Sequence, residues 1–171
     1  MRTLILGGVR SGKSRQAVEI AGTHPVTLIV TGAARDEEMA ARIEAHRRSR
    51  PPEWRVIEEP IRLAAALRRS AAPTEVVIVD CLTLWLSNLL CAGDAQALAR
   101  ESADLLETLP RFAGDCVLVS NDVGCGIVPV NALARRFADE AGTLHQRLAA
   151  VCDRVIWMVA GLPVTIKPGV S

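Results

Sequence analysis

Short runs of apolar residues alternate along the chain with longer segments in which apolar residues recur at helical spacing. Five runs predict strands: Thr3–Leu6, Val26–Thr31, Glu75–Asp80, Cys116–Ser120 and Arg154–Val159. These runs are continuously apolar rather than alternating, which is typical of parallel strands covered by helices on both faces. The pattern therefore predicts an α/β fold of three layers with a mostly parallel central sheet.

A glycine-rich motif follows the first predicted strand. It consists of Gly7, Gly8, Val9, Arg10, Ser11, Gly12, Lys13 and Ser14, satisfies the pattern G-x-x-x-x-G-K-[ST], and continues into a predicted helix that ends near Ala21. In such a loop, backbone N–H groups and the helix N-terminus surround a polyphosphate, a lysine reaches the β- and γ-phosphates, and a serine hydroxyl binds Mg²⁺. A chance turn rich in Gly and Ser is the alternative, but the flanking strand and helix favour a phosphate-binding loop.

Length, composition and charge limit the classes of protein that fit. The 171 residues, 50% of them hydrophobic, are enough for one sizeable core, so residues 1–171 are expected to form a single domain. A net charge of +1, no Tyr and two Phe give no sign of a nucleic-acid-binding surface. No apolar run approaches the roughly 18–20 residues of a membrane span, and no targeting segment is apparent. We expect a cytoplasmic protein that binds no nucleic acid.

The five cysteines predict neither a disulfide framework nor a zinc site. They are odd in number, widely spaced and free of any C-x-x-C pair. We expect reduced thiols, three of them in or beside apolar runs as small core residues.

Polar residues follow the predicted strands where ligands bind in open α/β sheets. Thr31, Gly32 and Ala33 come after the second strand and could line the same crevice as the phosphate loop. Asp80 ends the third strand, the arrangement that places an acid beside the loop's Mg²⁺. Asp80 as the N-cap of a helix through Leu82–Leu90 is the alternative. The presence of a phosphate loop favours the metal-binding role.

The fourth predicted strand leads into Asn121–Pro129, a segment rich in polar side chains and glycine. It could close over a ligand, or it could be a structural turn in which Gly124 and Gly126 supply positive φ. The sequence leaves both interpretations open.

The segment Asp36–Arg50 is the most charged part of the chain, and a helical stripe of apolar residues reaches His46. Spacing alone favours a packed histidine near a helix C-terminus, followed by a solvated basic run. The alternative is that His46 attacks a nucleotide phosphate while Arg47, Arg48 and Arg50 hold the phosphates.

Together these motifs resemble the bifunctional adenosylcobinamide kinase and adenosylcobinamide-phosphate guanylyltransferase family of cobalamin biosynthesis, over essentially the whole chain. The segments that carry the resemblance are GG-x-RSGKS at Gly7–Ser14, DEEMAARI-x-x-H at Asp36–His46, RP-x-x-W at Arg50–Trp54, Glu58, the strand ending Asp80-Cys81, VLVSNDVG-x-GIVP at Val117–Pro129, and N-x-LAR-x-F-x-D-x-x-G at Asn131–Gly142. Several motifs in one order are far more specific than a phosphate loop alone.

The resemblance implies two reactions on a P-loop NTPase-type, RecA-like fold. Adenosylcobinamide would be phosphorylated by ATP or GTP, and adenosylcobinamide phosphate would then accept GMP from GTP, giving adenosylcobinamide-GDP. The second reaction would pass through a GMP-histidine, which the resemblance assigns to His46, against the preference from spacing. It also implies Mg²⁺ and a homotrimer.

The resemblance further assigns binding residues. Gly7–Ser14 would hold the triphosphate, with Lys13 also catalytic, and Ser14 and Asp80 would contact the metal. Contacts to the guanine nucleotide would come from Thr31, Gly32, Ala33, Arg47, Arg48, Ser49 and Arg50, with Glu58 and Asp80 completing the site. Without the resemblance, Glu58 would be interpreted as a plain surface carboxylate.

Two positions depart from the family pattern, and two other functions stay open. Asp122 stands where Glu is frequent, and His145 where Asn is frequent, in a helical segment where a packing role is equally compatible. A small-molecule kinase with the same loop would need no nucleotidyl transfer and would leave His46 as a packed residue. A nucleotide-gated binding module or a RecA-like nucleic-acid motor is disfavoured by the neutral charge and the polar residues at the strand ends.

Overall fold

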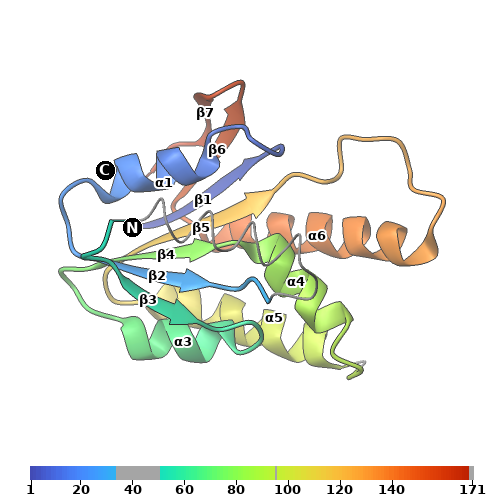
Figure 1. Ribbon diagram of the computed structural model, residues 1–171, viewed down its shortest axis with the longest axis horizontal. Helices are drawn as coiled ribbons and strands as arrows, with labels where there is room; N and C mark the ends of the chain where they lie inside the picture. The colour runs from blue at the N-terminus through green and yellow to red at the C-terminus, as the bar shows by residue number, and fades with distance from the viewer. Residues whose placement is uncertain (34–50, 95, 170–171) are drawn as a thin grey trace.

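A computed structural model of the chain describes residues 1–33, 51–94 and 96–169. In this part of the chain, seven strands form one sheet in the order β3-β2-β4-β5-β1-β6-β7 (Figure 1). The strands are β1 (Arg2–Gly7), β2 (Val26–Val30), β3 (Arg55–Glu58), β4 (Val76–Asp80), β5 (Asp115–Asn121), β6 (Arg154–Val159) and β7 (Leu162–Lys167). All neighbouring pairs are parallel except β6 and β7, which are antiparallel. The carboxyl ends of six strands therefore meet at one edge of the sheet.

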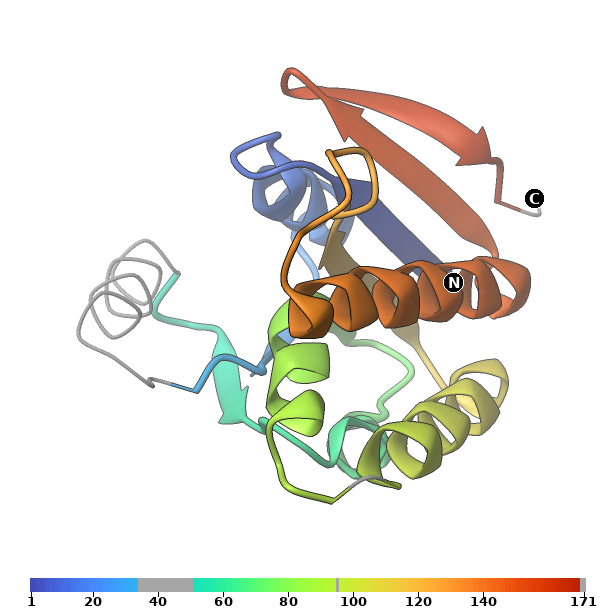
Figure 2. The same cartoon turned by 90° about the vertical axis from the view of Figure 1, so that its right-hand side faces the viewer.

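Helices cover both faces of the sheet. They are α1 (Lys13–Ala21), α3 (Leu63–Ser70), α4 (Leu82–Leu90), α5 (Ala97–Thr108) and α6 (Ala132–Val151), with a short 3-10 helix at Leu109–Arg111. Helix α1 lies on one face, and α3, α4, α5 and α6 lie on the other (Figures 1 and 2). Among the described residues, no helix combines the length and the hydropathy that crossing a membrane requires.

Side chains of the central strands divide between two apolar clusters, one on each face. Leu4 and Leu118 belong to the cluster that includes residues of α3 to α6, and Ile5 and Val117 to the cluster that includes residues of α1. Because both faces are covered, strands such as β2 are buried at every position. This explains why these strands are continuously apolar, and it confirms the predicted α/β fold with a mostly parallel sheet.

The five predicted strands correspond to β1, β2, β4, β5 and β6, with ends that differ by a residue or less. The strands β3 and β7 were not predicted. Each lies at an edge of the sheet, and each is largely exposed. Because edge strands are not buried on both faces, their sequences need not form a continuous apolar run. Pro163 further weakens the pattern expected of a strand in β7.

A bidentate ion pair fastens the start of β1 to the turn before β6. The Arg2 guanidinium donates to Asp153 Oδ2 at 2.8 Å and to Oδ1 at 2.5 Å, and the Arg2 backbone N–H donates to Oδ2 at 2.7 Å. These contacts, led by the side-chain hydrogen bond from Arg2, lower the pKa of Asp153 to about 2. The carboxylate is therefore held in its charged form in the folded protein.

We expect Asp153→Asn to lower stability at neutral pH but not near pH 2. The folded-state pKa of Asp153 lies below its value of about 3.9 in an unfolded chain, so its contribution is present above pH 4 and is lost as pH falls through about 2. Urea unfolding of both proteins between pH 6 and pH 2 measures this. The difference in unfolding free energy between the wild type and Asp153→Asn should shrink as the pH falls. A difference that stays constant would contradict the lowered pKa of Asp153.

Candidate nucleotide-binding site

The glycine-rich motif forms the turn between β1 and α1, and two of its glycines are required by geometry. A Cβ on Gly7 would lie 2.7 Å from the Met158 carbonyl oxygen and 2.7 Å from Ser11 Oγ, closer than real contacts allow. Gly12, the N-cap of α1, has φ of 95° and supplies no capping side chain. The first turn of α1 therefore presents backbone N–H groups without a side-chain acceptor, which is the arrangement that binds anions.

Lys13 lies inside this loop. Its side chain is 7% exposed, and Nζ donates to the Gly8 carbonyl oxygen at 2.5 Å and lies 3.4 Å from Ser11 Oγ. Desolvation on burial lowers the pKa of Lys13, because few groups compensate the charge of its ammonium group. An anionic phosphate in the loop would supply that compensation.

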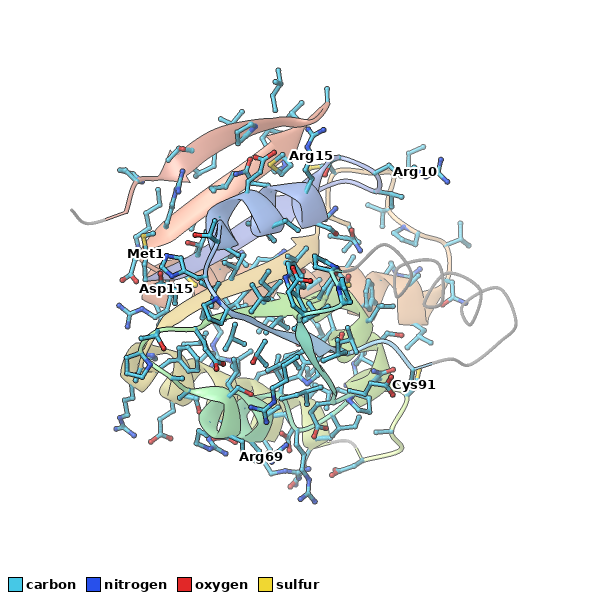
Figure 3. All side chains as sticks on the ribbon, turned by 60° about the vertical axis from the view of Figure 1, so that its left-hand side comes forward. Met1, Arg10, Arg15, Arg69, Cys91 and Asp115 are labelled. Atoms are coloured by element: carbon cyan, nitrogen blue, oxygen red, sulfur yellow. The ribbon has the colours of Figure 1, made fainter. Side chains whose placement is uncertain are left out.

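The turn between β6 and β7 supports the loop from outside. Gly161 N–H donates to the Ser11 carbonyl oxygen at 3.1 Å, and Arg15 Nη2 donates to the Gly161 carbonyl oxygen at 2.9 Å. Figure 3 shows Arg15 beside this hairpin, with Arg10 at the outer side of the loop. Sequence reasoning did not find this support, because β7 itself was not predicted.

Asp80 and Ser14 come together at the carboxyl edge. Ser14 Oγ donates to Asp80 Oδ2 at 3.4 Å, which joins the start of α1 to the end of β4. The alternative role of Asp80 as an N-cap is wrong, because the N-cap of α4 is Cys81 and no side chain caps that helix. The pairing of a hydroxyl with a half-buried carboxylate fits the predicted metal contact.

These two oxygen atoms fit Mg²⁺ that is shared with a nucleotide. Mg²⁺ prefers oxygen ligands and is usually held by one or two carboxylates together with substrate phosphates and waters. Within residues 1–33, 51–94 and 96–169, no group of three or more His, Cys, Asp or Glu could hold a metal by itself. The donor set therefore suits a metal that arrives with the triphosphate.

The corner after β2 is fixed by polar contacts to β4 and α4. The Thr31 hydroxyl donates to the Cys81 carbonyl oxygen at 2.6 Å and accepts from Cys81 N–H at 3.1 Å. Asn88 Nδ2 donates to the carbonyl oxygens of Thr31, at 2.7 Å, and Pro60, at 3.1 Å. Because the Thr31 side chain is fully buried in these contacts, it positions the half-buried residues Gly32 and Ala33.

Glu58 ends β3 and lies on the same row of the sheet as Asp80. Val30 pairs with Glu58 on one side and with Asp80 on the other, so both carboxylates leave the same face, about 10 Å apart across two strand spacings. Its neighbour Glu59 has a different role, since its Oε1 accepts from the backbone N–H groups of Ile61, at 3.2 Å, and Arg62, at 2.8 Å, at the start of α3. Glu58 is exposed and available to a ligand.

The segment after β5 begins at the phosphate loop. Asp122 N–H donates to the Gly7 carbonyl oxygen at 2.9 Å, and Asn121 Nδ2 donates to Thr83 Oγ1 at 2.9 Å. Neither Gly124 nor Gly126 has a positive φ, so the alternative in which these glycines supply one, which the sequence left open, does not hold. The turn is made instead by the Asp122 carboxylate, which accepts from Gly124 N–H at 3.1 Å.

His145 lies in α6 and contacts the strand below the site. Its Nε2 lies 2.7 Å from Ser120 Oγ, and burial lowers its pKa. Ser120 is fully buried in β5. This contact favours a structural role for His145, in which the ring joins α6 to β5 in its neutral form.

The remaining predicted site residues, His46, Arg47, Arg48, Ser49 and Arg50, lie outside the described residues. All five cysteines are described and are free thiols. Cys81, Cys116 and Cys152 are buried, as expected for small core residues, and burial raises the pKa of Cys152 to about 11.

Comparison with known proteins identifies a family. Residues 3–166 match the family described as cobinamide kinase / cobinamide phosphate guanyltransferase. The chain is 52% identical, over 98% of its length and 98% of the relative, to the bifunctional adenosylcobalamin biosynthesis protein CobP of Pseudomonas aeruginosa. It is 41% identical to the corresponding CobU protein of Escherichia coli, over 98% of this chain and 100% of that one.

Solved structures share the fold at low sequence identity. The P4 protein from bacteriophage phi6, solved with ADP, has a TM-score of 0.54 and 18% identity, over 97% of this chain and 55% of that one. The ATPase EscN from the type III secretion system of enteropathogenic E. coli has a TM-score of 0.55 and 12% identity, over 96% of this chain and 47% of that one. These neighbours share the α/β fold, in agreement with the P-loop NTPase-type fold that the family resemblance implies.

The chain has two lysines, Lys13 and Lys167, and we expect their substitution by Met to have opposite effects. Lys13→Met should weaken GTP binding at least about tenfold, because it removes a charge-assisted contact to phosphate. It should leave the unfolding free energy without nucleotide unchanged or raised, because burial disfavours the ammonium. Titration with a fluorescent GTP analogue and urea unfolding measure the two quantities.

Lys167→Met is the matched control. Lys167 Nζ donates to the carbonyl oxygens of Ala149, at 3.0 Å, Ala150, at 3.3 Å, and Cys152, at 2.6 Å, at the end of α6. Its loss should cost about 1 kcal/mol of stability and leave GTP affinity unchanged. Equal GTP affinity in both variants would overturn the role of Lys13.

Proposed function

Because the chain belongs to the cobinamide kinase / cobinamide phosphate guanyltransferase family, we propose that its one phosphate loop serves both reactions of the family. The chain is accordingly a bifunctional transferase of adenosylcobalamin biosynthesis. The observation that carries the proposal is the convergence of Lys13, Ser14 and Asp80 at the carboxyl edge of the sheet. The kinase and guanylyltransferase reactions then differ in which phosphorus atom of the bound nucleotide is attacked.

In the kinase reaction, the aminopropanol hydroxyl of adenosylcobinamide attacks the γ-phosphorus of ATP or GTP. A new O–P bond forms, the bond from the γ-phosphorus to the bridging oxygen breaks, and the nucleoside diphosphate leaves as the hydroxyl loses its proton. Lys13 and the N–H groups of the first turn of α1 stabilise the negative charge on the phosphates. Because burial lowers the pKa of Lys13, the negative charge of a bound phosphate favours the charged form of its ammonium group.

In the guanylyltransferase reaction, we assign the attacking group to His46 on the strength of the family motif. An imidazole nitrogen attacks the α-phosphorus of GTP, a P–N bond forms, and pyrophosphate leaves. A phosphate oxygen of adenosylcobinamide phosphate then attacks the same phosphorus, the P–N bond breaks, and adenosylcobinamide-GDP is released with His46 restored. The histidine thus divides one transfer into two displacements.

Other residues are proposed to bind the nucleoside. We propose that Gly32, Ala33 and Glu58 contact it, and that Arg47, Arg48, Ser49 and Arg50 complete the guanine nucleotide site. Ser14 and Asp80 would hold Mg²⁺, which when bound neutralises phosphate charge at the reacting phosphorus. We further propose a homotrimer in the cytoplasm, where ATP and GTP are supplied.

The first test uses GTP labelled with ³²P at the α-phosphate. We expect wild-type protein with Mg²⁺ to acquire label that survives alkali and is lost in acid, as a phosphoramidate behaves. His46→Ala should abolish the label, while its phosphorylation of adenosylcobinamide continues. Gel analysis of the labelled protein and product chromatography measure the two activities.

His24→Ala is the control, since His24 is an exposed histidine in the turn before β2. It should label as the wild type does. Label that persists in His46→Ala would exclude the proposed intermediate. A wild-type protein that phosphorylates the substrate but never acquires label would instead be a small-molecule kinase.

A second test concerns the metal contact. Asp80→Asn keeps the size of the side chain but removes its charge, so the apparent Mg²⁺ affinity of both reactions should fall by about tenfold or more. Initial rates as a function of Mg²⁺ concentration measure this. Glu59→Gln, just after β3, is the matched control. If the Mg²⁺ dependence of Asp80→Asn is the same as that of the control, the assignment is wrong.

A further inference from the structure

The segment between β5 and α6, together with the first turn of α6, carries exposed apolar side chains. Ile127 is 96% exposed, Val128 73%, Val130 97% and Leu133 53%. We call these four residues the apolar ridge. Contiguous exposed apolar residues on a protein surface commonly mark a binding site, because each one forgoes the free energy of burial until an occupant arrives.

Hydrogen bonds hold both ends of the ridge. At its start, the Asp122 carboxylate accepts from Gly124 N–H, and Cys125 Sγ donates to the same carboxylate at 3.2 Å. At its end, Arg135 Nη1 donates to the carbonyl oxygens of Pro129, at 3.0 Å, and Val130, at 2.5 Å. Asn131 Oδ1 accepts from Ala134 N–H as the N-cap of α6. The side chains are therefore held outward by the local backbone geometry.

The segment that carries the ridge begins at the phosphate loop. Asp122 N–H donates to the Gly7 carbonyl oxygen, and Figure 1 shows the segment extending outward from the end of β5 before α6 begins. Five Cα–Cα steps lead from Asp122 to Ile127, which limits the distance between these two residues to about 18 Å. An occupant of the ridge that spans about this distance would therefore reach the Gly7 end of the phosphate loop.

We propose that the apolar ridge binds the corrin macrocycle of adenosylcobinamide and presents its aminopropanol arm to the phosphate loop. This rests on the proposed function, which supplies the identity of the acceptor. The periphery of a corrin carries methyl groups that apolar side chains can cover, and its reactive hydroxyl lies at the end of a flexible arm. Such a substrate offers peripheral methyl groups, set between its amide side chains, to Ile127 and Val130, and carries its reactive hydroxyl on an arm that can extend to the γ-phosphate.

A pocket elsewhere on the described surface fits this substrate poorly. It has a volume of about 380 Å³ and lies between α3 and α5, lined by charged residues that include Arg68, Asp104 and Arg111. Arg68 is already paired with Asp104 at 2.6 Å. Its lining residues precede β4 and β5, so it lies at the amino edge of the sheet, away from the phosphate loop.

The experiment compares two double variants. Ile127→Ser with Val130→Ser removes the most exposed side chains of the ridge, and Val164→Ser with Ile166→Ser removes exposed apolar side chains of β7, which are 44% and 61% exposed. Equilibrium dialysis measures adenosylcobinamide binding without nucleotide, and steady-state kinetics gives KM for adenosylcobinamide and for GTP. Light scattering gives the mass of each protein in solution.

We expect the ridge variant to bind adenosylcobinamide at least about tenfold more weakly and to raise its KM by a similar factor. Its KM for GTP, its labelling by α-³²P GTP and its mass in solution should match the wild type, and the β7 variant should bind adenosylcobinamide normally. Equal adenosylcobinamide affinity in the ridge variant and the wild type would overturn the proposal. A ridge variant whose mass in solution is lower than that of the wild type would also overturn the proposal, since the ridge would then contact a second copy of the chain.

Failure of the proposed function has a different signature. If the wild type binds adenosylcobinamide but neither phosphorylates it nor takes label from GTP, the proposed reactions are wrong while the dialysis result still decides the role of the ridge. If the wild type takes label from GTP but does not bind adenosylcobinamide, the ridge proposal is wrong, while the proposed attack on the α-phosphorus of GTP is still supported.

Discussion

The close approach of β1 and β6 at Gly7 is the constraint on which the candidate site depends. With no side chain at Gly7, the chain turns from β1 into the phosphate loop against the Met158 carbonyl oxygen, where a Cβ would collide. The Gly7 carbonyl oxygen in turn accepts from Asp122 N–H, so the same residue fixes the start of the segment after β5. One small residue thereby sets the positions of both the phosphate loop and the apolar ridge.

Much of the fold and part of the site were predictable, for a physical reason that also explains the failures. Buried parallel strands must be apolar throughout, so β1 and β4 could be predicted from the sequence, with Asp80 at the end of β4. A phosphate loop needs glycine and lysine at fixed spacing, so Lys13 could be predicted as well. The strands β3 and β7 derive their conformation from pairing with a neighbouring strand rather than from burial. Strand pairing leaves no periodic pattern of apolar residues in the sequence. The position of Glu58 on the row of Asp80 is a property of strand register, which local sequence does not encode.

Polar residues near the carboxyl edge divide into those that bind the protein to itself and those that remain available. Thr31, Asn88 and Asn121 all donate hydrogen bonds within the fold, between strands and α4. Ser120 and His145 form a similar contact beneath β5. Sequence reasoning cannot separate the two classes, because both are polar residues that follow apolar strands. The separation requires the hydrogen-bond partners. It leaves as side chains that can face a nucleotide the exposed Glu58 and the pair of Ser14 and Asp80, which hydrogen-bond to each other at 3.4 Å.

The hairpin of β6 and β7 has a consequence for the thermodynamics of the whole molecule. Its turn contacts the phosphate loop through Gly161 and Arg15, while β7 is an exposed edge strand of the kind that opens by local unfolding. Opening of the hairpin and occupancy of the loop are therefore linked equilibria. A nucleotide that binds only the closed arrangement stabilises the hairpin, and a substitution that opens the hairpin lowers nucleotide affinity in proportion to the fraction of molecules that stay closed.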